Sequence, residues 1–353
     1  MRRRTWISLV IALAVLGALV LALYLRAKAP PEAARLLPES DAIIYVNLKP
    51  LRAATHFDES QVPRSADLER FIDQTGIVPE HDLEAAAFAL HRMPNPHGPN
   101  GAVAYSEVFV GHFDGGRLAQ YLSSIARSQE TYAGQIIYTI PIEGRLLRVA
   151  QLGFDMVAAS NMPTPEQIHS MIDRSRASAV SSPGSSLLAA RFHNVPLLAQ
   201  AWGIGHIGLP FAHNGQISFL GVQLPVSSES DLVASIRWIT AVPLHGGSAE
   251  LRVEEFAGDP MDAERTVNAL NALLAIVRGI ATAEPPRGPA DIALRQVLDS
   301  ATLQHRDGRA LLHASATLDQ LKAILSAHDP ASAASASTAL DPESTSNSTT
   351  SKQ

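Results

Sequence analysis

The prediction of the fold starts from two stretches of the sequence that are similar to each other: DLEAAAFALHRMPNPHGPNGA (residues 82–102) and DLVASIRWITAVPLHGGSAE (residues 231–250). Each one reads as an apolar strand followed by a turn rich in glycine and proline. The residues that match at one offset are Asp82 with Asp231, Leu83 with Leu232, Ala85 with Ala234, and Pro94 with Pro243. This self-similarity predicts an internal duplication.

The residues that follow each stretch extend the match. A second strand pattern covers residues 102–113 in the first case and 249–258 in the second, so each stretch is expected to open a β-hairpin. An aspartate then precedes a helical pattern, Asp114 in the first case and Asp262 in the second. An aspartate at this place can cap a helix by accepting hydrogen bonds from its first free N–H groups.

A further match closes each half. TPEQIHSMI (residues 164–172) parallels TLDQLKAIL (residues 317–325), and both have the Thr-x-x-Gln spacing of a capping box. Hairpins joined to helices favour an antiparallel sheet. The sequence therefore predicts the α+β class, as two tandem similar halves, each an antiparallel sheet with helices packed on one face, after an N-terminal transmembrane helix.

The start of the chain predicts a membrane anchor. The segment Trp6–Leu25 contains no charge and no proline, and twenty residues form a helix of about 30 Å, which matches the hydrocarbon core of a bilayer. A cleaved secretory signal has a shorter apolar run followed by a small-x-small site. Ala27-Lys28-Ala29 has that pattern, but Pro30 follows it and disfavours cleavage. We therefore expect the segment to be retained as a signal anchor.

The charges around the anchor predict its orientation. Arg2, Arg3 and Arg4 precede the apolar segment, and Arg26, Lys28 and Arg35 follow it. Moving the short tail outward would work against the membrane potential at about 2.3 kcal/mol per charge per 100 mV, whereas long domains cross largely regardless of charge. We expect a single-pass protein of the bacterial inner membrane whose large domain is periplasmic.

Composition divides the rest of the chain. The linker is rich in alanine and proline, which favours an extended spacer, and the C-terminal tail is mostly serine, threonine and alanine, which cannot bury enough apolar surface to fold. The Ser/Pro/Gly-rich residues 181–186 mark the boundary between the halves. The predicted segments are a cytoplasmic tail (1–5), a transmembrane helix (6–25), a linker (26–38), a first α+β repeat (39–180), a second α+β repeat (181–328) and a disordered tail (329–353).

Charge and cysteine content exclude several functions. The net charge is −6, and no basic cluster follows Arg35, which argues against nucleic acid as a partner because phosphate binding needs clustered Lys and Arg. The chain contains no cysteine. Lipid attachment to a cysteine and thiol catalysis are therefore excluded.

The segment LLPESDAIIYVNLKPL (residues 36–51) combines a Leu-Pro stem with a strand that contains Tyr-Val. In this it is similar to uncharacterised bacterial envelope proteins that have a single N-terminal membrane anchor. The resemblance covers the first half of the chain. It implies an anchored envelope protein of unknown function, and it brings no catalytic residues.

The stretch GIGHIG (residues 203–208) has the glycine spacing of a dinucleotide-binding fingerprint. That fingerprint works only between a strand and the N-terminus of a helix. Here a helical pattern precedes the glycines and a stretch with Pro210 follows them. We interpret these glycines as a flexible connection between the halves.

Histidines supply the candidates for chemistry. There is no His-Glu-x-x-His pattern, which would mark a zinc helix. His193, His206 and His213 lie in an irregular stretch without neighbouring carboxylates. His112 and Asp114 lie near the end of a predicted strand. The candidate residues are His112, Asp114, His193, His206 and His213, and no metal or cofactor is predicted.

Three hypotheses for the function remain. The first is a non-catalytic binding or envelope accessory module, tied to the membrane by Trp6–Leu25, that offers a surface to a protein, peptide or lipid partner. The second is a periplasmic metal-dependent hydrolase that uses the candidate histidines. The third is a carrier of apolar ligands.

Overall fold

The computed structural model describes residues 16–17, 28–59, 64–142, 144–177, 184–206, 212–213, 216–219, 222–224, 230–239, 247–283 and 285–326. Apart from Leu16 and Gly17, the predicted anchor Trp6–Leu25 lies outside the described residues. The predicted disordered tail (329–353) also lies outside them.

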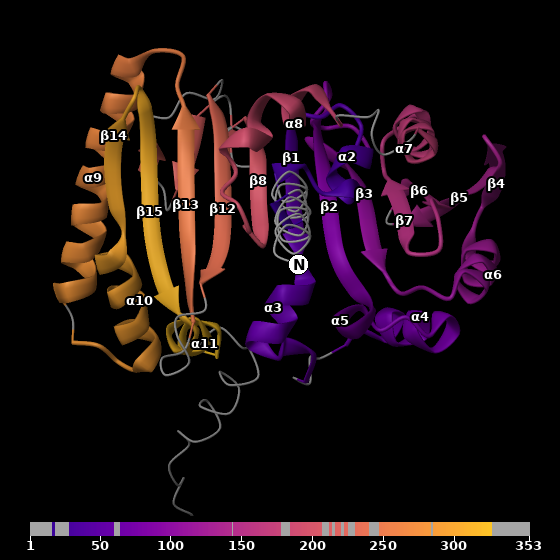
Figure 1. Cartoon of the computed structure of the whole chain (residues 1–353), viewed down its shortest axis with the longest axis horizontal. Coiled ribbons are helices and arrows are strands. Elements are labelled where there is room, and N and C mark those ends of the chain that lie inside the picture. Colours follow the sequence, from indigo (N-terminus) through magenta and orange to yellow (C-terminus); the bar gives the residue numbers. More distant parts are fainter. Residues whose placement is uncertain are drawn as a thin grey trace, which may run out of the picture.

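The described strands form one large antiparallel sheet and one small sheet. The large sheet has 12 strands in the order β14-β15-β13-β12-β8-β1-β2-β3-β7-β6-β5-β4, and the small one has the order β11-β10-β9 (Figure 1). The large sheet contains β1 (Ala42–Asn47), β2 (Leu83–Arg92), β3 (Val103–Gly111), β4 (Ser128–Tyr132), β5 (Gln135–Ile142), β6 (Arg145–Gln151), β7 (Met156–Ser160), β8 (Ala201–His206), β12 (Asp231–Ile239), β13 (Ser248–Phe256), β14 (Thr302–Arg306) and β15 (Arg309–Thr317). The small sheet contains β9 (Ala212–His213), β10 (Gln216–Phe219) and β11 (Val222–Leu224).

The predicted α+β class and the antiparallel pairing are confirmed, because every neighbouring pair in the large sheet is antiparallel. The expectation of one sheet for each half is wrong in one respect. Strands from residues 39–180 and from residues 181–328 meet at the β1–β8 pair and share a single sheet. An antiparallel edge strand has free backbone N–H and C=O groups, and pairing two such edges satisfies them.

Helices surround this sheet. They are α2 (Glu32–Leu36), α3 (Leu48–Thr55), α4 (Ala66–Thr75), α5 (Pro79–Asp82), α6 (Gly115–Ile125), α7 (Glu166–Arg176), α8 (Ser186–Arg191), α9 (Pro260–Ala283), α10 (Pro289–Ser300) and α11 (Leu318–Ser326), with the short 3-10 turns η1 (Phe57–Glu59) and η2 (Phe192–Asn194). In Figure 1, α9 and α10 lie beside β14, and α4 and α6 lie at the opposite end of the molecule.

The glycine-rich stretch at residues 203–208 is not a flexible connection, and that prediction is wrong. Its first part belongs to β8, which pairs with both β1 and β12 near the middle of the sheet. Gly205 lies opposite Ala42 on β1, and a Cβ atom at Gly205 would collide with the Cα and Cβ atoms of Ala42. The glycine is therefore needed for the close approach of two backbones.

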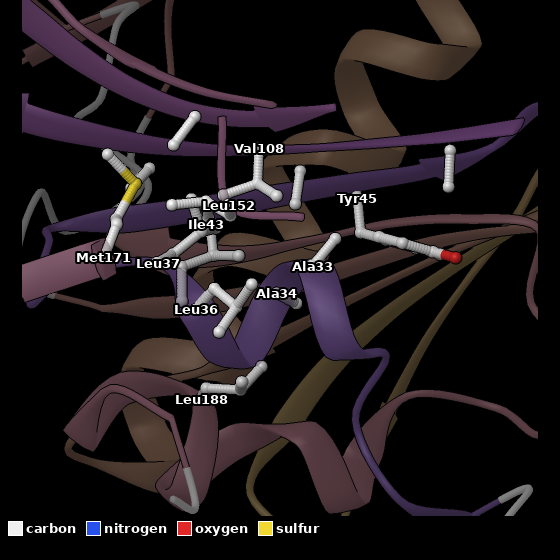
Figure 2. Packing of buried hydrophobic residues seen from close by; sticks show 14 of the residues in the cluster. Ala33, Ala34, Leu36, Leu37, Ile43, Tyr45, Val108, Leu152, Met171 and Leu188 are labelled. Carbon is white, nitrogen blue, oxygen red and sulfur yellow. The ribbon is translucent and has the colours of Figure 1, made fainter. Parts of the chain in front are cut away.

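In the first half both faces of the sheet are covered, so the prediction of helices on one face is wrong there. One core cluster joins α2 and α7 to residues such as Ile43, Val108 and Ile137, and Figure 2 shows Leu36 and Leu37 beside Ile43 and near Leu188. A second cluster joins α4 and α6 to Tyr138 and Ile140 on β5. Because successive side chains of a strand point to opposite faces, the consecutive apolar residues of β5 require cover on both sides.

The predicted helix caps are confirmed in part. Asp114 accepts hydrogen bonds from Gly116 N and Arg117 N at the start of α6. Asp262 does not cap α9, because that helix already begins at Pro260 and Asp259 accepts from Met261 N. The Thr317 capping box forms, with Gln320 N donating to Thr317 Oγ1 and Thr317 N donating to Gln320 Oε1. Its predicted counterpart does not form, because Pro165 is the N-cap of α7 and makes no side-chain cap.

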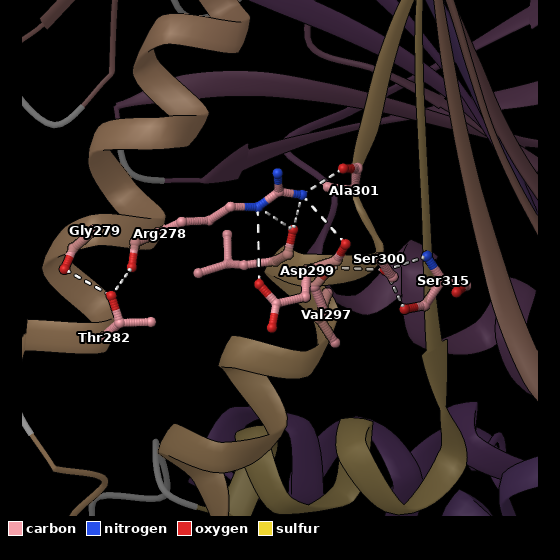
Figure 3. Close-up of polar contacts among 9 residues, drawn as sticks. Arg278, Gly279, Thr282, Val297, Asp299, Ser300, Ala301 and Ser315 are labelled. Atoms are coloured by element: carbon pink, nitrogen blue, oxygen red, sulfur yellow. Dashed lines mark hydrogen bonds and ion pairs between the residues drawn. The ribbon is translucent and has the colours of Figure 1, made fainter.

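Among the described residues, α9 is the one helix long and apolar enough to cross a membrane by length and composition alone. It lies beside β14 and β15 and exposes Ile276 and Ile280. Its one charged residue after Arg265 is Arg278, whose guanidinium donates to the carbonyl oxygens of Leu298 and Ala301 (Figure 3). Arg278 thus adds donors at the C-terminal end of α10 and its C-cap Ala301, where few backbone N–H groups remain to pair with the carbonyl oxygens.

Candidate functional site

An apolar pocket lies between α4, α6 and one face of the sheet. Its volume is about 350 Å³, which falls within the range of small-molecule sites, about 300–1,000 Å³. It is lined by Phe71, Ile77, Pro79, Leu83, Glu107, Phe109, Phe113, Leu118, Tyr121, Leu122, Ile125, Ile140, Ile142, Leu147, Val149, Val157 and Ala159. We call this the Glu107 pocket, since Glu107 is the one acidic or basic residue among these lining residues.

Glu107 reaches the pocket from β3, in the interior of the sheet. Its partners in register are Phe88 on β2 and Ala159 on β7. Val108, the next residue along β3, is fully buried in the core cluster on the opposite face. The alternation of side chains along a strand therefore points Glu107 away from that core and toward α6.

The carboxyl group of Glu107 has no partner within the described part of the chain. No hydrogen bond or ion pair of a described residue reaches it. Burial raises the pKa of the Glu107 carboxyl from its ordinary value of 4.5 to about 7, because a low-dielectric environment disfavours the charged form. At neutral pH the pocket therefore holds a carboxyl group close to the midpoint of its titration.

Four aromatic rings line the same pocket as this carboxyl group. Phe71, Phe109, Phe113 and Tyr121 all line the pocket. Phe71 and Tyr121 meet edge to face, with ring centroids 5.4 Å apart, and so tie α4 to α6. Phe109 meets Phe88 edge to face at 6.0 Å on the sheet side. Edge-to-face pairs of this kind are favourable arrangements that fix ring orientation.

A second group of buried polar residues lies on the opposite face of the sheet. His91 Nε2 lies 3.0 Å from Ser106 Oγ, and Ser106 Oγ lies 3.0 Å from Ser160 Oγ. Burial lowers the pKa of His91, opposed by the nearby charge of Asp41. The side chains of all three residues are buried, and none of them lines the Glu107 pocket. We therefore regard the chain His91–Ser106–Ser160 as a satisfied structural network and not as a nucleophile with its base.

Two of the residues singled out from the sequence lie outside the Glu107 pocket. His112 is mostly exposed, and its Nδ1 atom lies 3.6 Å from Glu84 Oε1. Asp114 caps α6. The structure does not bring them into one ligand set, because the carboxylate of Asp114 is used by the helix N-terminus.

The other predicted residues also lie apart. His193 Nε2 is 3.1 Å from Asn194 Nδ2, and His206 Nδ1 is 2.9 Å from Asp231 Oδ1. The side chain of His213 lies outside the part that the structure describes. Within the described ranges, no group of three or more His, Asp or Glu side chains is placed to hold a metal ion.

Sequence reasoning missed Glu107. A signal was present, because Tyr105, Glu107 and Phe109 alternate along β3 and share one face. A carboxylate between two aromatic residues on one face of an interior strand is unusual, since buried strand positions favour apolar side chains. The sequence does not reveal that α4 and α6 cover this face and leave a cavity beside it.

The chain matches no protein-family model and no curated protein. Solved structures of TP0453 in crystal forms I, III and IV are similar at 11%, 12% and 12% sequence identity, with TM-scores of 0.40, 0.44 and 0.42. The alignments cover 84–85% of this chain and 97–99% of TP0453. At this identity and TM-score the likeness supports neither a family nor a function.

Proposed function

We propose that this protein is a single-pass, membrane-anchored binding protein of the bacterial envelope that holds an apolar small molecule in the Glu107 pocket. The observation that carries the proposal is the pocket itself, which has an almost wholly apolar lining and one carboxyl group without a partner. Pockets of this composition bind ligands through apolar contact, and a few polar groups fix the orientation. Binding of an apolar ligand thus unites two hypotheses, the binding module and the carrier.

The membrane part of the proposal rests on the sequence. Trp6–Leu25 is long and apolar enough to span a bilayer, and the three arginines before it favour a cytoplasmic N-terminus. The folded body would then lie in the periplasm. The extended spacer expected at residues 26–38 is wrong for its second part, because α2 (Glu32–Leu36) and Leu37 are buried in the core of the first half, so the tether would be shorter than that segment. This location would give the pocket access to apolar molecules that leave or enter the bilayer.

The two halves of the sheet are further proposed to have arisen by duplication. The hairpins β2–β3 and β12–β13 occupy equivalent places on either side of the central β1–β8 pair, and β7 and β15 follow next to them in the sheet order. Helices α7 and α11 come directly after β7 and β15 in the chain. This order supports the sequence match between residues 82–102 and 231–250. The Glu107 pocket belongs to the first half, where α4 and α6 provide its outer wall.

A metal-dependent hydrolase gains no support from a described contact. The candidate residues His112, His193 and His206 each have a separate neighbourhood, and hydrolysis by a bound metal needs three convergent ligands with an open position. The function that we propose is therefore the binding of an apolar ligand.

Narrowing the pocket should reduce binding of an apolar probe. Ile142 and Ile136 lie on the same strand and are both 45% exposed, but only Ile142 is among the pocket residues. We expect Ile142→Trp to weaken binding of the neutral dye N-phenyl-1-naphthylamine by about fivefold or more, because a larger ring takes up part of the cavity. Binding is measured by dye fluorescence on the full-length protein in phosphatidylcholine nanodiscs, with empty nanodiscs subtracted.

Ile136→Trp is the matched control and should bind the dye as the natural protein does. Circular dichroism and thermal unfolding of both variants check that each one is folded. Equal dye binding by the natural protein and by the Ile142→Trp variant would contradict the proposed pocket, as would a natural protein that takes up no dye beyond the nanodisc background.

The location has a separate test. Alkaline phosphatase fused after Gln353 should be active in intact bacterial cells, and a green fluorescent protein at the same place should stay dark when exported through the same route, because the long domain is expected to cross the membrane. N-terminal sequencing of the membrane-bound protein should find residues upstream of Ala29. A bright fluorescent fusion, or a mature protein that begins at Pro30, would contradict the anchored periplasmic arrangement.

A further inference from the structure

We propose that the Glu107 pocket selects an organic cation: a ligand with an apolar body and an amine or quaternary ammonium head that lies against the Glu107 carboxylate. This inference rests on the proposed function and adds the chemical class of the ligand.

The Glu107 carboxylate has no counter-ion among the described lining residues, and a bound cation would supply one. No Lys, Arg or His side chain belongs to the described lining of the pocket, and no ion pair of the described residues involves Glu107. A partly buried carboxylate without a partner costs free energy of folding. A ligand that brings its own positive charge regains part of that cost on binding, whereas a purely apolar ligand would bury the carboxyl group further.

The aromatic and aliphatic residues that line the pocket favour the same ligand. Phe71, Phe109, Phe113 and Tyr121 surround the cavity. Aromatic faces attract organic cations through their ring quadrupoles, and sites for quaternary ammonium groups combine such rings with a carboxylate or carbonyl oxygen. The aliphatic lining from α6 and β5, such as Leu118, Leu122 and Ile140, suits the apolar body of the ligand.

The same features disfavour an acid. A fatty carboxylate would place a second negative charge beside Glu107 without a cation to offset it, and like charges at close range repel strongly in a low-dielectric site. A neutral alcohol can donate a hydrogen bond to the carboxylate but brings no charge. The expected order of affinity is therefore ammonium, then alcohol, then carboxylate.

The pH dependence follows from the groups around the carboxyl group. On β3 the neighbours on the same face are Tyr105 and Phe109, and the neighbours across the strands are Phe88 and Ala159. From α4 and α6 the titratable side chain that lines the pocket is Tyr121, which is neutral at ordinary pH. Among the described lining residues, Glu107 is thus the group whose charge changes between pH 5.5 and pH 8. The preference for a cation should appear at pH 8 and fade at pH 5.5.

The test compares three ligands with the same eight-carbon chain: octylammonium, octan-1-ol and octanoate. Each one displaces N-phenyl-1-naphthylamine from the full-length protein in phosphatidylcholine nanodiscs, and empty nanodiscs correct for partition into lipid. At pH 8 we expect octylammonium to displace the dye at a concentration about tenfold lower than octan-1-ol, since a charge-assisted hydrogen bond is stronger than a neutral one. Octanoate should be the weakest of the three.

Glu107→Gln keeps the size of the side chain and removes its charge. In this variant octylammonium and octan-1-ol should displace the dye at similar concentrations at both pH values. Glu69→Gln on the exposed face of α4 is the matched control and should keep the tenfold preference.

The outcomes separate the two proposals. Dye binding without a preference for octylammonium, a preference that persists in Glu107→Gln, or stronger displacement by octanoate would each overturn the cation inference and leave the apolar pocket standing. Absence of protein-dependent dye binding would overturn both. A tenfold preference at pH 8 that disappears at pH 5.5 and in Glu107→Gln would support the inference.

Discussion

Replacing Glu107 by glutamine should raise the free energy of unfolding, relative to the natural protein, by about 3 kcal/mol more at pH 8 than at pH 4.5. Burial raises the pKa of the Glu107 carboxyl from 4.5 to about 7. Between these values the folded state holds a proton that the unfolded state has released. Stability therefore falls as the pH rises from 4.5 to 7, and the full cost is present above pH 7.

The measurement is urea unfolding of both proteins at pH 4.5, 6 and 8, followed by circular dichroism. The advantage of the Glu107→Gln variant over the natural protein should grow with pH. The exposed-site variant Glu69→Gln should follow the natural protein at each pH. Parallel pH profiles for the natural protein and Glu107→Gln would show that Glu107 ionises normally and is not enclosed as described.

This prediction also bears on the function. A side chain that lowers stability at neutral pH is not explained by the fold, since an apolar residue at the same place would pack against Phe109 and Ala159 without an unpaired charge. A residue that lowers the stability of the folded protein is typical of a binding site. The binding test with octylammonium and the unfolding test thus examine the same carboxyl group by independent means.

A single methyl group at Gly205 should destabilise the protein by about 3 kcal/mol. The added Cβ atom would meet the backbone of Ala42 and the carbonyl oxygen of Asp41, and neither can move without disturbing the β1–β8 pair at the centre of the sheet. Chemical unfolding of Gly205→Ala, compared with the natural protein, measures the loss.

Gly203→Ala is the matched control, because Gly203 lies two residues earlier on the same strand and the same face. There the nearest atom to an added Cβ is the carbonyl oxygen of Ile43 at 3.7 Å, an ordinary contact. We expect a change of less than about 1 kcal/mol for this control. Similar losses for the two variants would mean that β8 does not approach β1 as closely at Gly205 as the structure indicates.

The sequence predicted several elements with nearly correct bounds. The strand with Tyr-Val that was expected within residues 36–51 is β1 (Ala42–Asn47), and the two predicted hairpins are β2–β3 and β12–β13. These elements have local signals, namely period-two apolar patterns and Gly/Pro turns. Strand β8, which contains Gly205, was not predicted because glycine has a low propensity for strands. In the sequence, a glycine that allows two backbones to approach closely resembles a loop residue.

The candidate site was not predicted, for a different reason. His112 and Asp114 drew attention as residue types that carry chemistry, yet Asp114 serves the helix start. Glu107 carries no motif, and its importance depends on the absence of a partner, which no spacing along the chain reveals. Only the packing of α4 and α6 over β3, β5 and β7 shows that this carboxyl group faces an apolar cavity.

By itself, the sequence determined the apolar N-terminal segment, the lack of thiol chemistry and the antiparallel hairpins, because each depends on neighbouring residues and their periodicity. The tertiary structure decided that twelve strands share one sheet and that both faces of its first half are covered. It also decided that Glu107 faces an apolar pocket whose described lining holds no counter-charge. Edge pairing and burial depend on residues far apart in the chain, so local patterns do not encode them.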